Sequence, residues 1–409
     1  MTAESGADWR RNQIAVTAAA FIGFTGFTLV MPFLPLYFEQ LGVADVGDIA
    51  LWSGVSLGVT PAITALMAPL WGRMADRYGR KLMVQRSLAS FVVVMAAMAF
   101  VAEPWHVFAL RALQGLFAGY GALTLTMAAD IAPPGQTAYA IGFVQTAQRI
   151  GPALGPVIGG LVAQAVGLRD AFFVTASFYL AALLVVSFGY DERAVGTHVA
   201  KKDERVTFRS FFAFENFLLL MGVIFGLQFV DRSFGPVLPL FVSMLGTESS
   251  RVPLLSGVLF SISAAAGSIG HHLAGALMQR SGARKVIACA CGLAGISVGA
   301  FLAAGSAWWL VLPTAVFGMS IGAATTSAYT AASSIIPSGA RGSGFGLLTT
   351  ASLVGLAVSP IVNGLLGASS IRAVFLADAL LLCAVALLVS RLMITAPLPV
   401  TESLPTEEL

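Results

Sequence analysis

The chain has 409 residues, of which 57% are hydrophobic and 11% are charged, and its formal net charge is +3. A water-soluble chain of this length could not cover its surface with so few charged side chains, so the composition excludes a soluble globular protein. It predicts a protein embedded in lipid, where apolar surface does not face water. The small positive charge gives no reason to expect nucleic-acid binding.

Long apolar segments follow one another along the whole chain. A helix that spans a bilayer needs about 20 apolar residues, and we find twelve candidates. The predicted fold class is therefore an all-α membrane protein with twelve transmembrane helices. The candidates cover residues 13–41, 48–72, 82–102, 105–130, 137–165, 169–190, 213–244, 252–278, 285–305, 307–335, 342–368 and 371–393.

The second half of the sequence repeats the first at an offset of 203 or 204 residues. Pro32 and Pro35 of the first candidate correspond to Pro236 and Pro239 of the seventh. We expect both proline pairs to break their helices, which is typical of transporter substrate sites. The repeat predicts two pseudo-symmetric six-helix bundles around a central cavity. The bundles cover 1–190 and, with a short cytoplasmic tail, 213–409, and a cytoplasmic linker covers 191–212.

Basic residues are distributed unevenly between the two sides of this topology. With both termini on one side, 17 of the 23 Lys and Arg residues fall on that side and three on the other. Because cytoplasmic loops carry the excess of basic residues, we expect both termini to lie in the cytoplasm of a multi-pass cell-membrane protein. The other three are inside predicted spans: Arg111, Arg149 and Arg232.

A short loop after the second candidate combines glycines, a carboxylate and several cations. Glycines tolerate the backbone of a tight turn, and cations suit a cytoplasmic loop. The cations alone would account for orientation, but they leave the glycines and Asp76 unexplained. The equivalent loop of the second half has Gln279 in place of the acid. The first loop reads Gly72-Arg-Met-Ala-Asp76-Arg77-Tyr-Gly79-Arg80-Lys81.

The fourth candidate contains a lone cation in the pattern Arg111-Ala-Leu-Gln114-Gly115. Such an arginine can snorkel to the membrane interface, or it can take part in transport. Its counterpart in the second half is Thr314. The charge is therefore not needed for the fold, which favours a functional role.

The fifth candidate is rich in glycine and proline. Glycines four residues apart lie nearly on one face of a helix and allow a neighbouring helix to approach closely. Gln145 and Arg149 lie one and two turns ahead on a related face. The segment reads Gly151-Pro152-Ala-Leu-Gly155-Pro156-Val-Ile-Gly159-Gly160.

Two candidates contain acidic residues, which are costly inside a membrane and are therefore functional candidates. The seventh has Asp231 and Arg232, with Gln228 one turn earlier. Adjacent residues point about 100° apart on a helix, so we expect Asp231 and Arg232 not simply to pair. We predict Asp231 as the proton carrier and keep Asp378 of the twelfth candidate as the alternative.

No metal or cofactor site is predicted. His271 and His272 are adjacent in the eighth candidate, and two adjacent histidines cannot easily face one metal ion. No further cluster of Cys, His or acidic residues completes such a site. The chain also lacks a G-x-x-x-x-G-K-[ST] loop, so we expect that ATP does not drive it directly.

These motifs together resemble the major facilitator superfamily. The loop at 72–81 matches its G-x-x-x-D-R-x-G-R-K signature, and residues 111–115 look like its R-x-x-Q-G motif. Residues 151–160 resemble the G-x-x-x-G-P-x-x-G-G signature of the superfamily's antiporters. The resemblance extends over essentially the whole chain.

The resemblance implies roles for two sets of charged and glycine residues. One set forms a charge cluster that latches the two halves together when the transporter faces outward, and the other couples transport to protons. The implied latch comprises Gly72, Asp76, Arg77, Gly79, Arg80, Lys81, Asp130 and, more weakly, Arg341. The proton-coupling set comprises Asp231, Arg232, Arg111 and Asp378.

The central cavity is expected to be lined mainly by candidates 1, 4, 7 and 10. Their aromatic residues predict an apolar, aromatic-rich cavity with few fixed polar groups, which suits lipophilic compounds better than sugars. The predicted substrate-binding residues are Phe24, Phe27, Met31, Phe117, Gln145, Phe225, Gln228 and Phe229.

The sequence thus favours a proton-coupled antiporter that exports lipophilic drugs, as in multidrug efflux and antibiotic resistance. The alternative is an exporter or importer of one metabolite, such as a sugar or an amino acid, on the same fold. A sensor would need a sizeable soluble domain and an enzyme would need a catalytic constellation, and we find neither. The expected partners are a lipophilic small molecule, protons and the lipid bilayer, and we expect a monomer.

Overall fold

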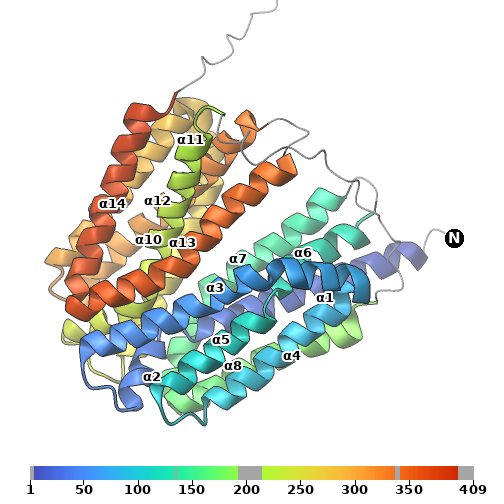
Figure 1. Ribbon diagram of the computed structural model, residues 1–409, viewed down its shortest axis with the longest axis horizontal. Coiled ribbons are helices and arrows are strands. Elements are labelled where there is room, and N and C mark those ends of the chain that lie inside the picture. Colours follow the sequence, from blue (N-terminus) through green and yellow to red (C-terminus); the bar gives the residue numbers. More distant parts are fainter. Residues whose placement is uncertain (1–3, 134–135, 192–213, 337–340, 395–409) are drawn as a thin grey trace, which may run out of the picture.

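A computed structural model describes residues 4–133, 136–191, 214–336 and 341–394. Over these residues the regular structure is helical, and no β-strand occurs among them. Figure 1 shows long helices that lie in two groups. One group belongs to the first half of the chain and the other to the second half.

The first group comprises the helices that precede residue 191. Its helices are α1 (Glu4–Leu29), α2 (Leu34–Gln40), α3 (Val46–Tyr78), α4 (Arg80–Met98), α5 (Pro104–Phe117), α6 (Tyr120–Ile131), α7 (Thr137–Val166) and α8 (Leu168–Gly189).

The second group begins after residue 213. Gly282 has φ +76° and divides α11 into two helical parts. The elements are α10 (Phe217–Met244), α11 (Val252–Gly299), the 3₁₀ turns η2 (Ala300–Ala303) and η3 (Ala307–Leu310), α12 (Val311–Ile335), α13 (Arg341–Ser369) and α14 (Ile371–Leu392).

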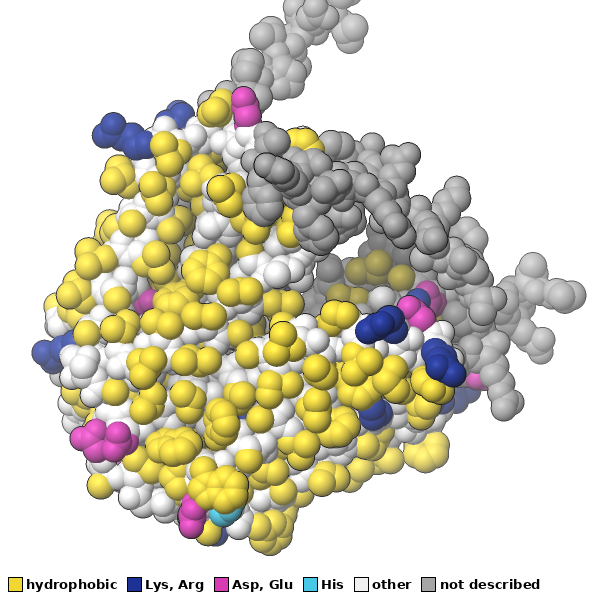
Figure 2. Space-filling model, in the orientation of Figure 1, with side chains coloured by type: hydrophobic (Ala, Val, Ile, Leu, Met, Phe, Trp, Pro, Cys, Tyr) yellow, Lys and Arg dark blue, Asp and Glu magenta, His cyan; other side chains and the backbone are white. Residues whose placement is uncertain are grey.

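The helices have the length and composition of membrane spans. Among the described residues, 10 helical segments are long and apolar enough to cross a bilayer. Helix α11 covers two predicted spans, one on each side of Gly282, whereas α5 and α6 together cover one. Figure 2 shows hydrophobic side chains over much of the visible face, with most charged side chains near the helix ends. The chain is therefore a multi-pass membrane protein.

The two proline pairs do not have the same effect. The first interrupts its helix as predicted, because α1 ends at Leu29 and α2 begins at Leu34. The second pair was expected to break its helix too, and that prediction is wrong, because α10 continues through Pro236 and Pro239. Every residue from 233 to 242 is buried, so packing from neighbouring helices holds this part of α10 in helical form.

A break that the sequence did not predict separates α5 from α6. Ala118 is extended, and Gly119 has φ +130°, a value that L-residues with a side chain rarely adopt. The last carbonyl groups of α5 therefore lack helical partners. Arg86 donates to Phe117 O at 3.0 Å, and Trp71 Nε1 donates to Leu116 O at 2.7 Å. These bonds satisfy backbone groups that lipid could not.

Equivalent positions of the two halves make equivalent contacts. Asn12 bonds to the backbone of Asp191 at 2.9 and 2.8 Å, and Asn216, 204 residues later, bonds to Ile394 at 2.9 Å in both directions. In the same way, Lys81 donates to the carbonyl of Ser187 near the end of α8, and Arg284 donates to the carbonyl of Ser390 near the end of α14. The sequence repeat is therefore also a repeat of tertiary contacts.

The two groups of helices meet along two seams that also correspond. A Cβ added at Gly54 of α3 would lie 2.1 Å from Pro360 O of α13. A Cβ added at Gly257 of α11 would lie 2.2 Å from Pro156 O of α7. Figure 1 shows that the groups approach at the end where α2 lies and diverge toward the end where α1 begins and α14 ends.

Candidate functional site

A cavity of about 730 Å³ lies between the two groups of helices. Its wall is formed by one face of each of several helices, from both halves of the chain. The described lining residues are Phe24, Thr28 and Met31 of α1; Leu125 of α6; Gln145, Gln148, Arg149, Pro152 and Pro156 of α7; Gln228, Asp231 and Arg232 of α10; Phe260, Ser263, Ala264, Gly267, Ser268 and His271 of α11; Gly318, Ile321, Gly322, Thr325, Thr326, Tyr329 and Thr330 of α12; and Thr349 of α13.

The predicted substrate-binding residues divide into two sets. Four of them line the cavity: Phe24, Met31, Gln145 and Gln228. Four are not among its lining residues: Phe27, Phe117, Phe225 and Phe229. Phe117 stacks on Trp71 with ring centroids 6.3 Å apart, at the end of α5. Phe225 and Phe229 pack on each other along α10 at 5.9 Å.

The cavity wall is more polar than the sequence predicted. We expected an apolar, aromatic-rich cavity with few fixed polar groups. The expectation of few polar groups is wrong, because most lining side chains are polar, although apolar atoms still make up the larger share of the exposed wall. The expectation rested on the aromatic residues along each span, but several of them turn toward neighbouring helices. The hydroxyl groups come mainly from the second half, at Ser263, Ser268, Thr325, Thr326, Tyr329, Thr330 and Thr349.

Asp231 and Arg232 form an ion pair on the cavity wall. Arg232 Nε lies 3.3 Å from Asp231 Oδ2, and the two side chains are 34% and 31% exposed. The expectation that these adjacent residues would not simply pair is therefore wrong. Their Cα–Cβ directions diverge, but the long arginine side chain bends back to reach the carboxylate. Among the described lining residues, Asp231 is the single carboxylate.

Arg149 of α7 brings a second arginine to the cavity, from the first half of the chain. Gln148 beside it donates to Gly121 O at 2.9 Å and to Thr124 Oγ1 at 3.1 Å. These bonds tie α7 to α6 and fix the direction of this part of the helix. Arg149 thus faces the cavity from the opposite half to Asp231.

Arg111 lies outside the cavity lining, in the core of the first half. Its side chain is 3% exposed, and its Nη1 donates to Gln114 Oε1 at 3.0 Å. Thr60 of α3 donates to the Arg111 carbonyl at 2.8 Å. The position excludes the snorkelling alternative, because the guanidinium is buried within the protein.

Asp378 of α14 also lies outside the cavity lining. It is 1% exposed, and it accepts a hydrogen bond from Ser233 of α10. In the described part of the chain no Lys or Arg forms an ion pair with it. Asp378 therefore joins two helices of the second half, whereas Asp231 faces the space between the halves.

The glycine motif of α7 packs against two different helices. Added Cβ atoms at Gly151, Gly155 and Gly159 would lie 2.9, 2.1 and 1.8 Å from atoms of α1. One at Gly160 would instead lie 2.5 Å from Pro253 O of α11 in the other half. Pro152 and Pro156 line the cavity between these contacts. The motif therefore brings α1, α7, α11 and the cavity wall together.

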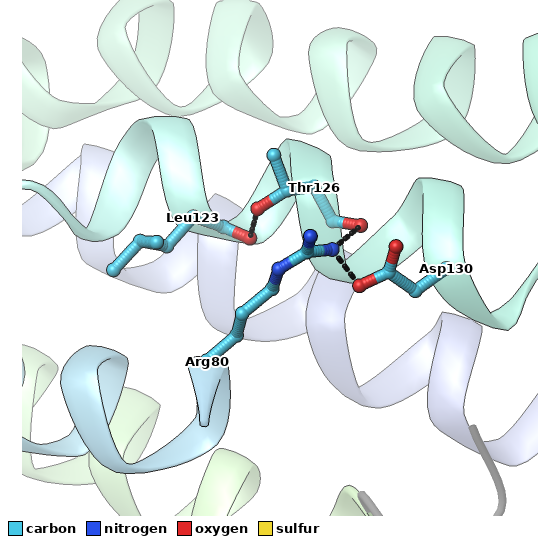
Figure 3. Close-up of polar contacts among 4 residues, drawn as sticks. All are labelled: Arg80, Leu123, Thr126 and Asp130. Atoms are coloured by element: carbon cyan, nitrogen blue, oxygen red, sulfur yellow. Dashed lines mark hydrogen bonds and ion pairs between the residues drawn. The ribbon is translucent and has the colours of Figure 1, made fainter. Parts of the chain in front are cut away.

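Among the described residues, the ion pair of the predicted latch lies within the first half. Arg80 pairs with Asp130, and its Nη1 also donates to Thr126 O at 3.2 Å (Figure 3), so these contacts remain within the first half. Asp76 is exposed, and no ion pair among the described residues involves it.

Arg77 and Lys81 also have contacts with described residues of the first half. Arg77 lies over the ring of Tyr78 at 5.3 Å, and Lys81 bonds to the end of α8. Gly79 has φ +94°, which explains the glycine in the turn between α3 and α4. Gly72 has open space around it. The backbone of Arg341 begins α13, and its side chain lies outside the described residues.

His271 is a lining residue for which the sequence raised only the question of metal binding. Its Nδ1 lies 2.7 Å from Thr326 Oγ1 of α12. Ser263, Gly267 and His271 follow one another at intervals of four on the cavity face of α11. This spacing of small and polar residues was the signal that could have identified the residue.

Comparisons with known proteins agree with this architecture. The family model described as Major Facilitator Superfamily matches residues 16–280 and 255–408. The multidrug resistance protein MdtG of Proteus mirabilis is 34% identical over 288 residues, covering 70% of this chain and 71% of that protein. MdtG of Escherichia coli K12 is 34% identical over 283 residues, covering 68% and 69%.

Solved structures show the same fold at low sequence identity. A bacterial homolog of the human lysosomal transporter Spinster, in an inward-facing and occupied conformation, has a TM-score of 0.76 and 16% identity, covering 93% of this chain and 96% of that one. The nucleoside transporter NupG has a TM-score of 0.71 and 14% identity, covering 92% and 98%. The match of the family model over nearly the whole chain shows that the protein belongs to the Major Facilitator Superfamily.

Proposed function

We propose that this protein is a proton-coupled antiporter that exports drugs or toxic compounds from the cell by alternating access. The names of its MdtG relatives support drug efflux. The observation that carries the coupling proposal is the position of Asp231, a carboxylate on the wall of the cavity between the two halves. The names of the relatives and the position of Asp231 in a cavity between the halves both fit a transporter of this family rather than an enzyme.

The proposed architecture has twelve crossings in two six-helix bundles, over 1–190 and 213–409. Two crossings belong to α11 and one is shared by α5 and α6. The matched contacts at positions 203 or 204 residues apart support the two-fold relation. We place both termini in the cytoplasm because of the distribution of basic residues. Thiol labelling of Ala3→Cys or Thr406→Cys from outside intact cells would contradict this orientation.

The proposed conformation is inward-facing. The helices diverge at the end that carries the termini, which the orientation assigns to the cytoplasm. At the other end the seams around Gly54 and Gly257 hold the halves in backbone contact. A substrate therefore enters from the cytoplasm, and a change of the angle between the halves exposes it to the outside.

The proposed coupling uses the ion pair of Asp231 and Arg232. A proton on Asp231 removes the negative charge and releases Arg232, so the loaded and unloaded cavities differ in charge. Substrate binding and proton binding then favour different states of the same cavity, which is the requirement for exchange. Arg149, on the opposite wall, adds a second positive charge to the same cavity.

The test uses everted membrane vesicles that contain the protein, energised to an acidic interior. Addition of a lipophilic substrate such as ethidium is expected to release protons from the vesicles, measured with a pH-sensitive dye. Vesicles without the protein are the control. Proton coupling would be contradicted if ethidium uptake did not alter the proton gradient and continued after the gradient had been collapsed.

A second candidate, an exporter of one polar metabolite, is favoured by the hydroxyl groups of the cavity wall. Sugars and similar metabolites need many hydrogen bonds, which Thr325, Thr326 and Thr330 of α12 could provide. Competition separates the two functions. A multidrug exporter is expected to show ethidium efflux that several unrelated lipophilic compounds inhibit. Efflux by an exporter of one metabolite is expected to be inhibited by a single class of compounds.

A further inference from the structure

A second cavity, of about 920 Å³, lies between the N-terminal parts of α1 and α7, and we call it the α1–α7 groove. It runs from Trp9 to Phe21 on one side and from Gln136 to Ile150 on the other. The two helices lie side by side within the first half (Figure 1), and Gln13 Nε2 donates to Ala140 O at 2.9 Å between them. The described residues of this groove do not line the cavity between the halves. The proposed transport cycle therefore does not use it.

Most of the groove is apolar and open to the surroundings of the protein. Ile14 of α1 is 69% exposed, and Phe143 and Ile150 of α7 are 49% and 46% exposed. From Arg10 to Phe21 a helix rises about 16 Å, which is about half of a 30 Å hydrocarbon core. The groove therefore has the length of one leaflet of the bilayer.

The mouth of the groove, where α1 and α7 begin, is polar and rich in hydrogen-bond donors. Arg10 and Gln136 are exposed there, and Trp9 and Tyr139 line the same end. Each of these four side chains has at least one N–H or O–H group to donate. The described lining of the groove contains no carboxylate, and no ion pair among the described residues involves Arg10. The mouth thus offers a positive charge and several donors to a negatively charged ligand.

We propose that the α1–α7 groove binds an anionic phospholipid of the leaflet that faces the cytoplasm. The phosphate pairs with Arg10 and accepts hydrogen bonds from the mouth, and one acyl chain lies along the apolar wall. Tryptophan and tyrosine favour the level of the headgroups, and basic residues next to the bilayer attract anionic lipids. The inference does not depend on what the protein transports. It takes from the proposed topology only that α1 begins on the cytoplasmic side.

The experiment measures lipid binding to the purified full-length protein in a nonionic detergent by native mass spectrometry. The probes are dioleoylphosphatidylglycerol, which is anionic, and dioleoylphosphatidylcholine, which has the same acyl chains and no net charge. We expect the first phosphatidylglycerol to bind the wild type more tightly than the first phosphatidylcholine. Arg10→Gln should weaken phosphatidylglycerol binding about fivefold, the factor for one basic residue near an anionic surface. It should leave phosphatidylcholine binding unchanged.

Arg391→Gln is the matched control, because Arg391 is exposed in the last turn of α14 in the other half and does not line the groove. It is expected to bind both lipids as the wild type does. Ala18→Phe places an aromatic ring in the groove and should remove the tight phosphatidylglycerol site. If that variant does not fold, Arg10→Gln decides alone, since it changes only an exposed side chain.

Three results would overturn the proposal. One is equal affinity of the wild type for the two lipids, and another is wild-type binding of phosphatidylglycerol by Arg10→Gln. The third is displacement of the first phosphatidylglycerol by ethidium, which would make the groove a substrate site. The measurement involves no transport, so a failure of the vesicle test of antiport leaves its result unaffected.

Discussion

The three ionisable residues Arg111, Asp231 and Asp378 occupy different surroundings, although all were proton-coupling candidates. Asp231 faces the cavity and is paired with Arg232 at 3.3 Å. Asp378 is enclosed between α10 and α14 with Ser233, and Arg111 is enclosed in the first half with Gln114. A carrier must exchange its proton with each side of the membrane in turn. Of the three, only Asp231 lines the cavity between the halves.

We predict that Asp231→Asn abolishes proton-coupled efflux but preserves substrate binding. The amide has the shape of the neutral acid and cannot release a proton. Ethidium binding and ethidium-driven proton release are to be measured on the same preparation. Intact coupling in this variant would make Asp231 a structural residue and would return Asp378 to the leading place.

We predict a different pattern at Asp378. Asp378→Ala is expected to lower stability by about 1–3 kcal/mol, because it removes the buried hydrogen bond that joins α14 to Ser233 of α10. Asp378→Asn can still bond to Ser233, so it should restore most of the stability and retain coupled efflux. Thermal unfolding in detergent and the vesicle assay check the two parts. Loss of coupling in a stable Asp378→Asn protein would show that this residue carries protons.

At the scale of the helices, close approach depends on glycines that lie at points of contact. Gly159 of α7 lies against the backbone of Leu29, just before α1 ends, and Gly160 lies against α11 of the other half. Of these two adjacent glycines, the first makes a contact within its own half and the second makes a contact between the halves. Neither neighbour can move easily, because the atoms in contact belong to the backbone.

We predict that Gly159→Ala is strongly destabilising. Its Cβ would lie 1.8 Å from Leu29 O, and overpacking of this kind costs about 1–3 kcal/mol or more. Gly142→Ala in the same helix is the control, because no atom lies within 4 Å of its added Cβ. We expect the control to unfold at or above the wild-type temperature, since alanine favours a helix. Equal unfolding temperatures for both variants would contradict the contact.

For the whole molecule, the angle between the halves decides which charged groups can meet. The predicted latch residue Asp76 is exposed in the last turn of α3. Its neighbour Arg80 pairs with Asp130 within the first half (Figure 3). A latch that forms only when this end closes would be open in the present state. Its members would then stabilise the other state of the transport cycle.

We therefore predict that Asp76→Asn impairs efflux without lowering the stability of the protein in the present state. Loss of about 1–3 kcal/mol of coupling shifts populations roughly 5- to 150-fold between the two states. Cytoplasmic-side ethidium binding should be retained, while transport falls. Asp48→Asn, at the opposite end of α3, is an exposed control. Wild-type transport by Asp76→Asn would refute the latch.

Local patterns in the amino-acid sequence determined much of this protein by themselves. The apolar segments predicted a helical membrane protein, the repeat at 203 or 204 residues predicted matched halves, and the signature motifs indicated the family. These features could be predicted because a lipid-exposed helix must be apolar along its length and must form its backbone hydrogen bonds within itself. The loop at 72–81 and the glycines of α7 were likewise visible as short-range spacings.

Only the tertiary structure decided which side chains reach the cavity. It turned Phe117 toward Trp71 and brought His271 and Thr326 together on the wall, and it joined Asp231 to Arg232. It also interrupted the helix at Gly119 and kept α10 continuous through its prolines. Composition is set along one helix, but the rotation and packing of that helix depend on its neighbours. The direction of a polar side chain inside a bundle is therefore a property of the assembled molecule.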